Sequence, residues 1–200
     1  MRNLAGAMDG GWFAVETFGM ADYPDLLEQI NGVTQMSDDW RARARKLPKG
    51  NLFDDFAVGQ VFEHHWGRTL NEGDNTLFST LTLSYNPLYF NAPYARAHGH
   101  RKIVINPMLV FLTVFGLSVE DLSEAGGLFL GVDNLTFHRR IYPGATLVAR
   151  STVEDKRESQ SRPESGIVTW HTEGFLADGD QGLVVDFRRS NLIPKRGIAK

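Results

Sequence analysis

Residues 108–115 restrict the possible folds of this chain more than any other segment. They read Met-Leu-Val-Phe-Leu-Thr-Val-Phe, and on a helix they are apolar on every side. Asn106 and Pro107 come just before them and form a typical helix start, with proline in the first turn. A helix without a polar face has to be buried all round. We therefore expect a central helix that lies inside the molecule and is wrapped by a sheet.

Four segments after this helix have the character of β-strands. They are residues 128–139, 145–154, 166–177 and 182–192. Turn residues at 142–144 and 178–182 separate three of them, and the polar segment 156–165 makes the remaining connection. Long strands joined by short connections pair antiparallel. The pattern predicts an α+β fold in which a long antiparallel sheet holds one buried helix.

The segments before the central helix predict one strand and two further helices. Residues 57–66 are strand-like. Asn71 and Asp74 resemble a capping box at the start of a helix. The apolar residues of this helix recur at helical spacing and are Leu77, Phe78, Leu81 and Tyr85. Asn91 followed by Pro93 starts a second, short helix.

The first 49 residues differ from the rest of the chain. A short helix is predicted after Asp22, and a second, basic helix after Ser37. The apolar surface of this segment is too thin for an independent domain. We expect residues 1–49 to form a partly helical extension that packs on a partner surface, and residues 50–196 to form one domain.

Composition excludes several classes of protein. Hydrophobic residues make up 42% and charged residues 22%, which excludes wholesale disorder and coiled coil. The net charge of −3 has the wrong sign for a general nucleic-acid binder. The chain has no cysteine, which removes thiol nucleophiles, disulfides and cysteine metal sites. No apolar run suits a signal peptide or a membrane span, so we expect a cytoplasmic protein that contacts neither membrane nor nucleic acid.

Six segments occur in an order typical of one enzyme family. They are residues 53–62, 68–74, 86–88, 104–109, 142–147 and 156–163. Together they resemble the MaoC-like dehydratases, which include the hotdog-fold (R)-specific enoyl-CoA hydratases. The branch that this chain most resembles handles branched or dicarboxylic acyl-CoA thioesters such as mesaconyl-CoA or methylmalyl-CoA. The resemblance implies a single hotdog domain, with a long antiparallel sheet wrapped around a buried central helix, after an N-terminal helical extension.

The resemblance implies addition of water to an α,β-unsaturated thioester, or the reverse, but the reactive positions differ. This chemistry needs a base, an acid and an N–H donor for the enolate-like oxygen. The family pattern is Gly-Asp-x-Asn-Pro-Leu-His-x-Asp. Here Ser84 replaces the first Asp, Tyr89 the His and Asn91 the second Asp. Asn106-Pro107 stands where the family has His-Gly, and proline has no N–H to donate.

Three interpretations follow from these departures. In the first, the chain is an acyl-CoA hydratase or dehydratase that uses other residues as acid and base. Tyr89 is then the proton donor or orients water, and Ser84 orients water. Asp74, His98 or His100 then supplies the titratable partner. In the second, catalysis is lost and the chain only binds acyl-CoA or a similar small molecule. In the third, the chain is a thioesterase, the other common hotdog chemistry.

Further residues are candidates for binding the substrate. The Met108 N–H and the Asn106 amide are substitutes for the missing oxyanion donor, and Asn91 is a third candidate. Arg139 and Arg140 are candidates for the phosphates of coenzyme A, because guanidinium groups pair well with phosphate. We expect coenzyme A to be part of the substrate and no separate cofactor to be needed.

The remaining polar residues receive structural interpretations. Asn86 is expected to brace its loop through hydrogen bonds to the backbone, in addition to its place in the reactive motif. His138 and His171 lie in predicted strands and are interpreted as core or surface residues. No recognised metal-ligand spacing occurs among His64, His65, His98 and His100, so no metal site is expected. Because pairing would hide an exposed strand edge, we expect a homodimer or a higher homo-oligomer.

Overall fold

The computed structural model describes residues 50–179 and 181–197. All of them belong to the unit Pro48–Lys200. The two helices predicted after Asp22 and Ser37 lie outside the described residues.

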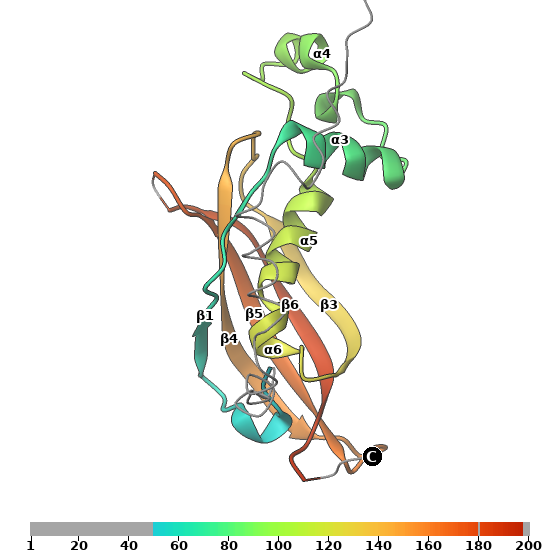
Figure 1. Cartoon of the computed structure of the whole chain (residues 1–200), viewed down its shortest axis with the longest axis vertical. Coiled ribbons are helices and arrows are strands. Elements are labelled where there is room, and N and C mark those ends of the chain that lie inside the picture. The colour runs from blue at the N-terminus through green and yellow to red at the C-terminus, as the bar shows by residue number, and fades with distance from the viewer. Residues whose placement is uncertain (1–49, 180, 198–200) are drawn as a thin grey trace, which may run out of the picture. The chain divides into compact units, whose positions relative to one another are not determined.

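One antiparallel sheet makes up most of the described fold (Figure 1). Its strand order is β1-β4-β5-β6-β3, and β2 pairs with β4. The four predicted long strands are confirmed, whereas the strand predicted at 57–66 is wrong in extent: two short strands, β1 and β2, occur in its place. The bounds are β1 Val61–Glu63, β2 Arg68–Thr69, β3 Leu128–Phe137, β4 Thr146–Glu158, β5 Ser165–Leu176 and β6 Leu183–Pro194.

The helices lie on one face of this sheet and beyond its end (Figure 1). The longest, α5, runs along the face, and α3 and α4 lie past its N-terminal end. None of the described helices combines the length and hydrophobicity that a membrane span requires. The bounds are η2 Phe53–Asp55, α3 Glu72–Leu81, η3 Pro87–Tyr89, α4 Ala92–Ala97, α5 Pro107–Leu117 and α6 Val119–Leu122.

The predicted central helix α5 packs on the sheet with only one of its sides. Val110, Phe111 and Val114 are buried, and the Phe111 ring meets Phe187 of β6 edge to face at 5.0 Å. Burial on all sides, as predicted, is wrong for this chain: Met108 and Leu112 are 44% and 46% exposed. The two residues are one turn apart and form a stripe on the side of the helix that the sheet does not cover.

Helix α3 differs from its predicted orientation. The capping box is confirmed, because the Asn71 and Asp74 side chains each accept a hydrogen bond from the other residue's backbone N–H at 3.0 Å. The apolar positions Leu77 and Leu81 are 60% and 73% exposed, whereas the polar residue Asn75 is fully buried. The polar side of α3 faces inward because the buried asparagine hydrogen-bonds to the backbone of other segments.

Close packing of α5 on the sheet predicts a marked effect for Gly174→Ala. A Cβ atom at Gly174 would lie 2.5 Å from Val114 Cγ2 and 3.1 Å from Val185 Cγ1. Overpacking of this kind costs about 1–3 kcal/mol of unfolding free energy. Gly131→Ala is the matched control, since no atom lies within 4 Å of that Cβ position. Urea denaturation of both variants measures the difference, and equal stability would contradict this packing.

Candidate functional site

Asn106 organises the N-terminal end of α5. Its side-chain oxygen accepts a hydrogen bond from the Met108 N–H at 3.0 Å, which caps the helix. Its Nδ2 atom donates to Ser84 Oγ at 3.1 Å and lies 3.5 Å from Ser79 Oγ. The Met108 N–H and the Asn106 amide, the two predicted substitutes for an oxyanion donor, are therefore already engaged in hydrogen bonds within the protein.

Asn75 of α3 connects three segments at this end of the helix. Its Nδ2 atom donates to the backbone oxygens of Tyr89 and Val104, at 2.7 and 3.0 Å. Its Oδ1 atom accepts from the Asn106 N–H at 2.7 Å. Sequence reasoning missed Asn75, because a polar residue on an amphipathic helix gives no sign that it faces inward. This one side chain fixes the backbone of Tyr89 relative to the start of α5.

A cavity of about 450 Å³ opens beside Tyr89, between η3, the start of α5 and the segment that follows β3. Four of the predicted residues line it: Tyr89, His100, Arg139 and Arg140. His138 lines it as well. Its apolar wall consists of Leu88, Val104, Ile105, Pro107, Val110, Phe137 and Ile141. The cavity thus combines an apolar wall with a few polar and titratable groups, a composition typical of small-molecule sites.

His138, which directly follows β3, belongs to a carboxylate-centred cluster with residues of β5 and β6. Asp186 of β6 accepts hydrogen bonds from His138 Nε2 at 2.6 Å and from His171 Nε2 at 2.9 Å. Partial burial acts to raise the pKa of Asp186, but the two histidine hydrogen bonds outweigh it and hold the pKa below its ordinary value. The ionised carboxylate orients the imidazole of His138, an arrangement that suits acid–base chemistry. Sequence reasoning missed this pair, because Asp186 is 48 residues away in the chain.

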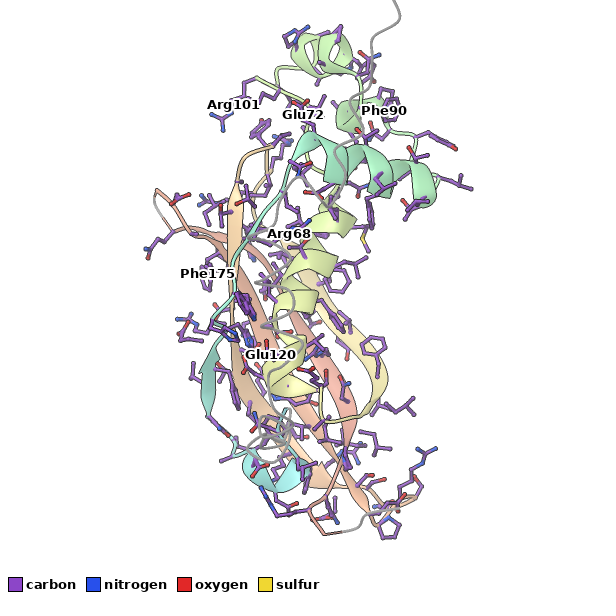
Figure 2. The ribbon with its side chains drawn as sticks, in the orientation of Figure 1. Arg68, Glu72, Phe90, Arg101, Glu120 and Phe175 are labelled. Atoms are coloured by element: carbon purple, nitrogen blue, oxygen red, sulfur yellow. The ribbon has the colours of Figure 1, made fainter. Side chains whose placement is uncertain are left out.

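Two predicted titratable residues do not line this cavity. Asp74 is held by the capping box of α3 and by Arg68, whose Nη2 lies 3.0 Å from Asp74 Oδ1. It lines a second cavity, of about 350 Å³, along the exposed side of α5. Figure 2 shows Arg68 beside α5 and Glu120 near its C-terminal end, and both line this second cavity. His98 stacks on Tyr94 with ring centroids 4.0 Å apart, outside both cavities.

The predicted asparagines and Ser84 make local hydrogen bonds. Asn86 Oδ1 accepts from the Leu88 N–H at 3.1 Å and starts η3, which is the bracing predicted for it. Asn91 Oδ1 accepts from the Tyr94 N–H at 3.0 Å and caps α4. Ser84 is held by Asn106, and none of the three lines the 450 Å³ cavity.

A buried Ser–His–Asp series lies elsewhere, under α6. His64 Nδ1 donates to Asp121 Oδ2 at 2.6 Å, and His64 Nε2 lies 2.9 Å from Ser151 Oγ. Ser151 Oγ in turn lies 2.8 Å from Thr172 Oγ1. This is the order of groups in a hydrolase triad, but Ser151 is fully buried. A serine that no substrate reaches is not a nucleophile, so the series connects β4, β5, α6 and the segment that follows β1.

The family model for mesaconyl-CoA hydratase matches residues 34–200. The chain is 40% identical over 173 residues to the mesaconyl-CoA hydratase of Haloarcula marismortui, with 86% of this chain and 48% of the relative covered. It is 34% identical over 151 residues to the β-methylmalyl-CoA dehydratase of Chloroflexus aurantiacus, with 76% and 42% covered. The chain therefore spans about half the length of the curated relatives it matches.

Solved structures agree with the fold. A MaoC domain protein dehydratase from Chloroflexus aurantiacus superposes with a TM-score of 0.69 at 31% identity, covering 78% of this chain and 44% of that one. RV0216 from Mycobacterium tuberculosis, which has a double hotdog fold, superposes with a TM-score of 0.65 at 26% identity, covering 76% and 46%. The predicted hotdog architecture is confirmed, and the described residues 50–179 and 181–197 contain one such sheet.

The role of Asn75 predicts a large stability loss for Asn75→Ala. The change leaves the Asn106 N–H and the oxygens of Tyr89 and Val104 without their partner, and each unsatisfied buried group costs about 1–3 kcal/mol. We expect a total loss of about 3 kcal/mol by chemical denaturation. The control, Asn71→Ala, removes an exposed helix cap and costs about 1 kcal/mol. Similar losses in both variants would show that Asn75 does not hold these segments together.

The buried histidine predicts a pH dependence of stability. Burial lowers the pKa of His64, against the opposing effect of the Asp121 carboxylate. An unfolded histidine titrates near about 6.5, so the unfolded chain takes up a proton as the pH falls through that value while the folded chain resists it. Stability is therefore full above about pH 6.5 and declines below it, by at most about 1.4 kcal/mol per pH unit from this group.

His64→Gln tests this origin, because it removes the titrating group. We expect His64→Gln to be less stable than the unchanged chain at pH 7.5 but to have a flatter profile between about pH 6.5 and 5. His65→Gln is the control, since the side chain of His65 is 55% exposed. Thermal unfolding across this pH range gives the comparison, and parallel profiles for all three chains would rule out His64 as the source.

Proposed function

The chain belongs to the mesaconyl-CoA hydratase family of MaoC-like dehydratases, and we propose from this premise that it hydrates or dehydrates an acyl-CoA thioester. The observation that carries the proposal is the cavity at the start of α5, where Tyr89 and His138 share one apolar-walled space. The names of the relatives favour a branched or dicarboxylic acyl group of the mesaconyl or methylmalyl type.

His138 and Tyr89 divide the proton transfers of the proposed reaction. In the hydration direction, His138 takes a proton from water through Nδ1, while its Nε2 stays hydrogen-bonded to Asp186. The water oxygen bonds to Cβ of the substrate, and the electron pair of the C=C bond moves toward the thioester carbonyl. A proton is then delivered to Cα, and Tyr89 is the donor or orients the water that donates it. Dehydration reverses these steps.

Basic residues beside this cavity support the binding of coenzyme A. An adjoining cavity of about 430 Å³ is lined by Arg101, Lys102 and Arg140, and Arg140 lines both cavities. Arg101 lies over the Tyr142 ring at 4.8 Å and projects from the end of the fold at which α4 lies (Figure 2). Guanidinium and ammonium groups bind phosphate, so the phosphates of coenzyme A fit here while the acyl group enters the first cavity.

The exposed apolar surface supports the homo-oligomer predicted from sequence. Strand β3 is at the end of the strand order, and Leu128, Phe129 and Leu130 are each about half exposed. The Met108 and Leu112 stripe of α5 adds to this surface. An open sheet edge with exposed apolar side chains is stabilised when a second chain covers it.

Binding of acyl-CoA without catalysis is the second candidate function. The hydrogen bonds of Asn106 favour it, because they occupy Ser84 and the Met108 N–H, the candidates for orienting water and for stabilising the oxyanion. In this alternative, the described hotdog domain binds acyl-CoA or a similar small molecule and catalyses no reaction.

A panel of acyl-CoA thioesters tests the proposed function with His138→Gln and Tyr89→Phe. Loss of the conjugated-thioester absorbance reports hydration, and a colorimetric thiol reagent reports thioesterase activity. We expect hydration by the unchanged chain, a loss of roughly 100-fold or more in kcat with His138→Gln, and no loss with the control His65→Gln. Saturable binding without turnover would favour the second candidate, and thiol release would replace both with thioesterase activity.

A further inference from the structure

We propose that Arg189 is the centre of an internal binding site for a small organic carboxylate. Arg189 lies on β6 and is fully buried, and its Nε, Nη1 and Nη2 atoms have no hydrogen-bond partner in the described part of the chain. Two further buried atoms are also unsatisfied, Trp170 Nε1 and Asn191 Oδ1. No function is assigned to these residues by the proposed hydration, and the inference is independent of it.

The sheet register brings these unsatisfied atoms together. Trp170 and Arg189 are cross-strand partners on β5 and β6, so their side chains are neighbours on one face. Asn191 follows Arg189 by two residues and shares that face, because side chains alternate along a strand. We call Trp170, Arg189 and Asn191 the Arg189 cluster. Four unsatisfied donor atoms and one unsatisfied acceptor thus belong to neighbouring side chains on the same face of the sheet.

The buried positive charge of Arg189 would be stabilised by an anionic partner. Burial lowers the pKa of Arg189 to about 10, so the guanidinium is still protonated at neutral pH. Its central carbon lies 4.4 Å from the Phe115 ring centroid and 5.3 Å from that of Trp170, and these cation–π contacts offset only part of the cost of burying a charge. A bound anion would satisfy the remaining donors.

The lining of the Arg189 cluster favours an organic carboxylate over a hydrated inorganic ion. The planar donor fork of arginine matches the two oxygens of a carboxylate. The Phe115 and Trp170 rings that contact the guanidinium provide apolar contacts for a carbon skeleton. The Asn191 Oδ1 acceptor suits a hydroxyl group on the same molecule.

The Arg189 cluster is separate from the cavity beside Tyr89. Phe115 follows Val110, the last residue of α5 that lines this cavity, by five residues, which corresponds to about 7.5 Å along the helix. A four-carbon acyl group held at the start of α5 does not span that distance. Phe115, which contacts the guanidinium of Arg189, meets the half-exposed Phe129 of β3 with ring centroids 5.7 Å apart. A Cβ atom on the exposed Gly127 would lie 3.9 Å from Asn191 Nδ2, on the same side.

Thermal unfolding and calorimetric titration with malate, succinate, acetate and chloride test the site. The unchanged chain should bind a carboxylate saturably and unfold at a higher temperature in its presence. Arg189→Met should weaken that binding by about tenfold or more, because it removes the charged donors. The control Arg188→Met should bind as before, since Arg188 is exposed and paired with Glu154. Failure of all carboxylates to bind, or equal binding of chloride, would overturn the proposal.

The stability of the ligand-free variant separates a binding role from a structural one. If the charge is unpaired without ligand, Arg189→Met should unfold at the same or a higher temperature than the unchanged chain. A strong loss of stability would overturn the proposal by indicating that Arg189 has a structural partner. Should Arg189→Met fail to fold, Arg189→Lys keeps the charge and should bind the carboxylate more weakly, because it lacks the planar fork.

Succinyl-CoA distinguishes the two sources of a carboxylate. Binding of free succinate that depends on Arg189 supports a free acid as ligand. Binding of succinyl-CoA that weakens by the same factor in Arg189→Met, without binding of free succinate, would overturn the proposal of a separate site, because an acyl group would then reach the Arg189 cluster. If neither depends on Arg189, the site does not exist. Turnover is not measured in this experiment, so its result stands whether or not the chain hydrates a thioester.

Discussion

The structure depends on the contact between one side of α5 and the inner face of the sheet. Val110, Phe111 and Val114 fit against strands that carry small residues where the helix comes closest, and Gly174 is the clearest example. This contact fixes where α5 begins, and Asn106 at that point fixes the segments that carry Ser84 and Met108. The cavity beside Tyr89 is therefore a consequence of how the helix is seated. A shift of α5 along the sheet would change the shape of this cavity and would leave the hydrogen bonds between the strands intact.

The inner face of the sheet is not uniformly apolar, and its polar layer divides the core. One apolar cluster includes Ala149 and Phe187, and a second includes Val153 and Trp170. Between them lie, on three adjacent strands, Ser151, Thr172 and Arg189. Ser151 and Thr172 are satisfied by each other and by His64, whereas Arg189 is not. Ser151 and Thr172 thus have a structural explanation. Arg189 has none, and this is the reason for the ligand that we propose.

Local sequence patterns predicted the helices and long strands well. They failed where the position of a side chain depends on a residue far away in the chain. Pro107 and the capping pair Asn71 and Asp74 mark real helix starts, because those signals act within one turn. The exposed stripe of Met108 and Leu112 was not predictable, since a helix that is apolar on every side gives no indication of which side the sheet covers. The His138 and Asp186 pair depends on the register of β3 and β6, with its irregularity between Asp133 and Thr136, and no periodicity reveals a register.

The neutral side chains at the start of α5 have a physical explanation. Ser84 and Asn106 are neutral, and together with Asn75 they form a continuous set of hydrogen bonds at the start of α5. A carboxylate at position 84 would have to be held ionised in this partly buried place, whereas serine satisfies Asn106 without a charge. Titratable groups occur instead across the cavity, where Asp186 is ionised and hydrogen-bonded to His138. If His138 and Asp186 take part in acid–base chemistry, the substrate has to approach them from the end of β3, on the side of the cavity opposite η3.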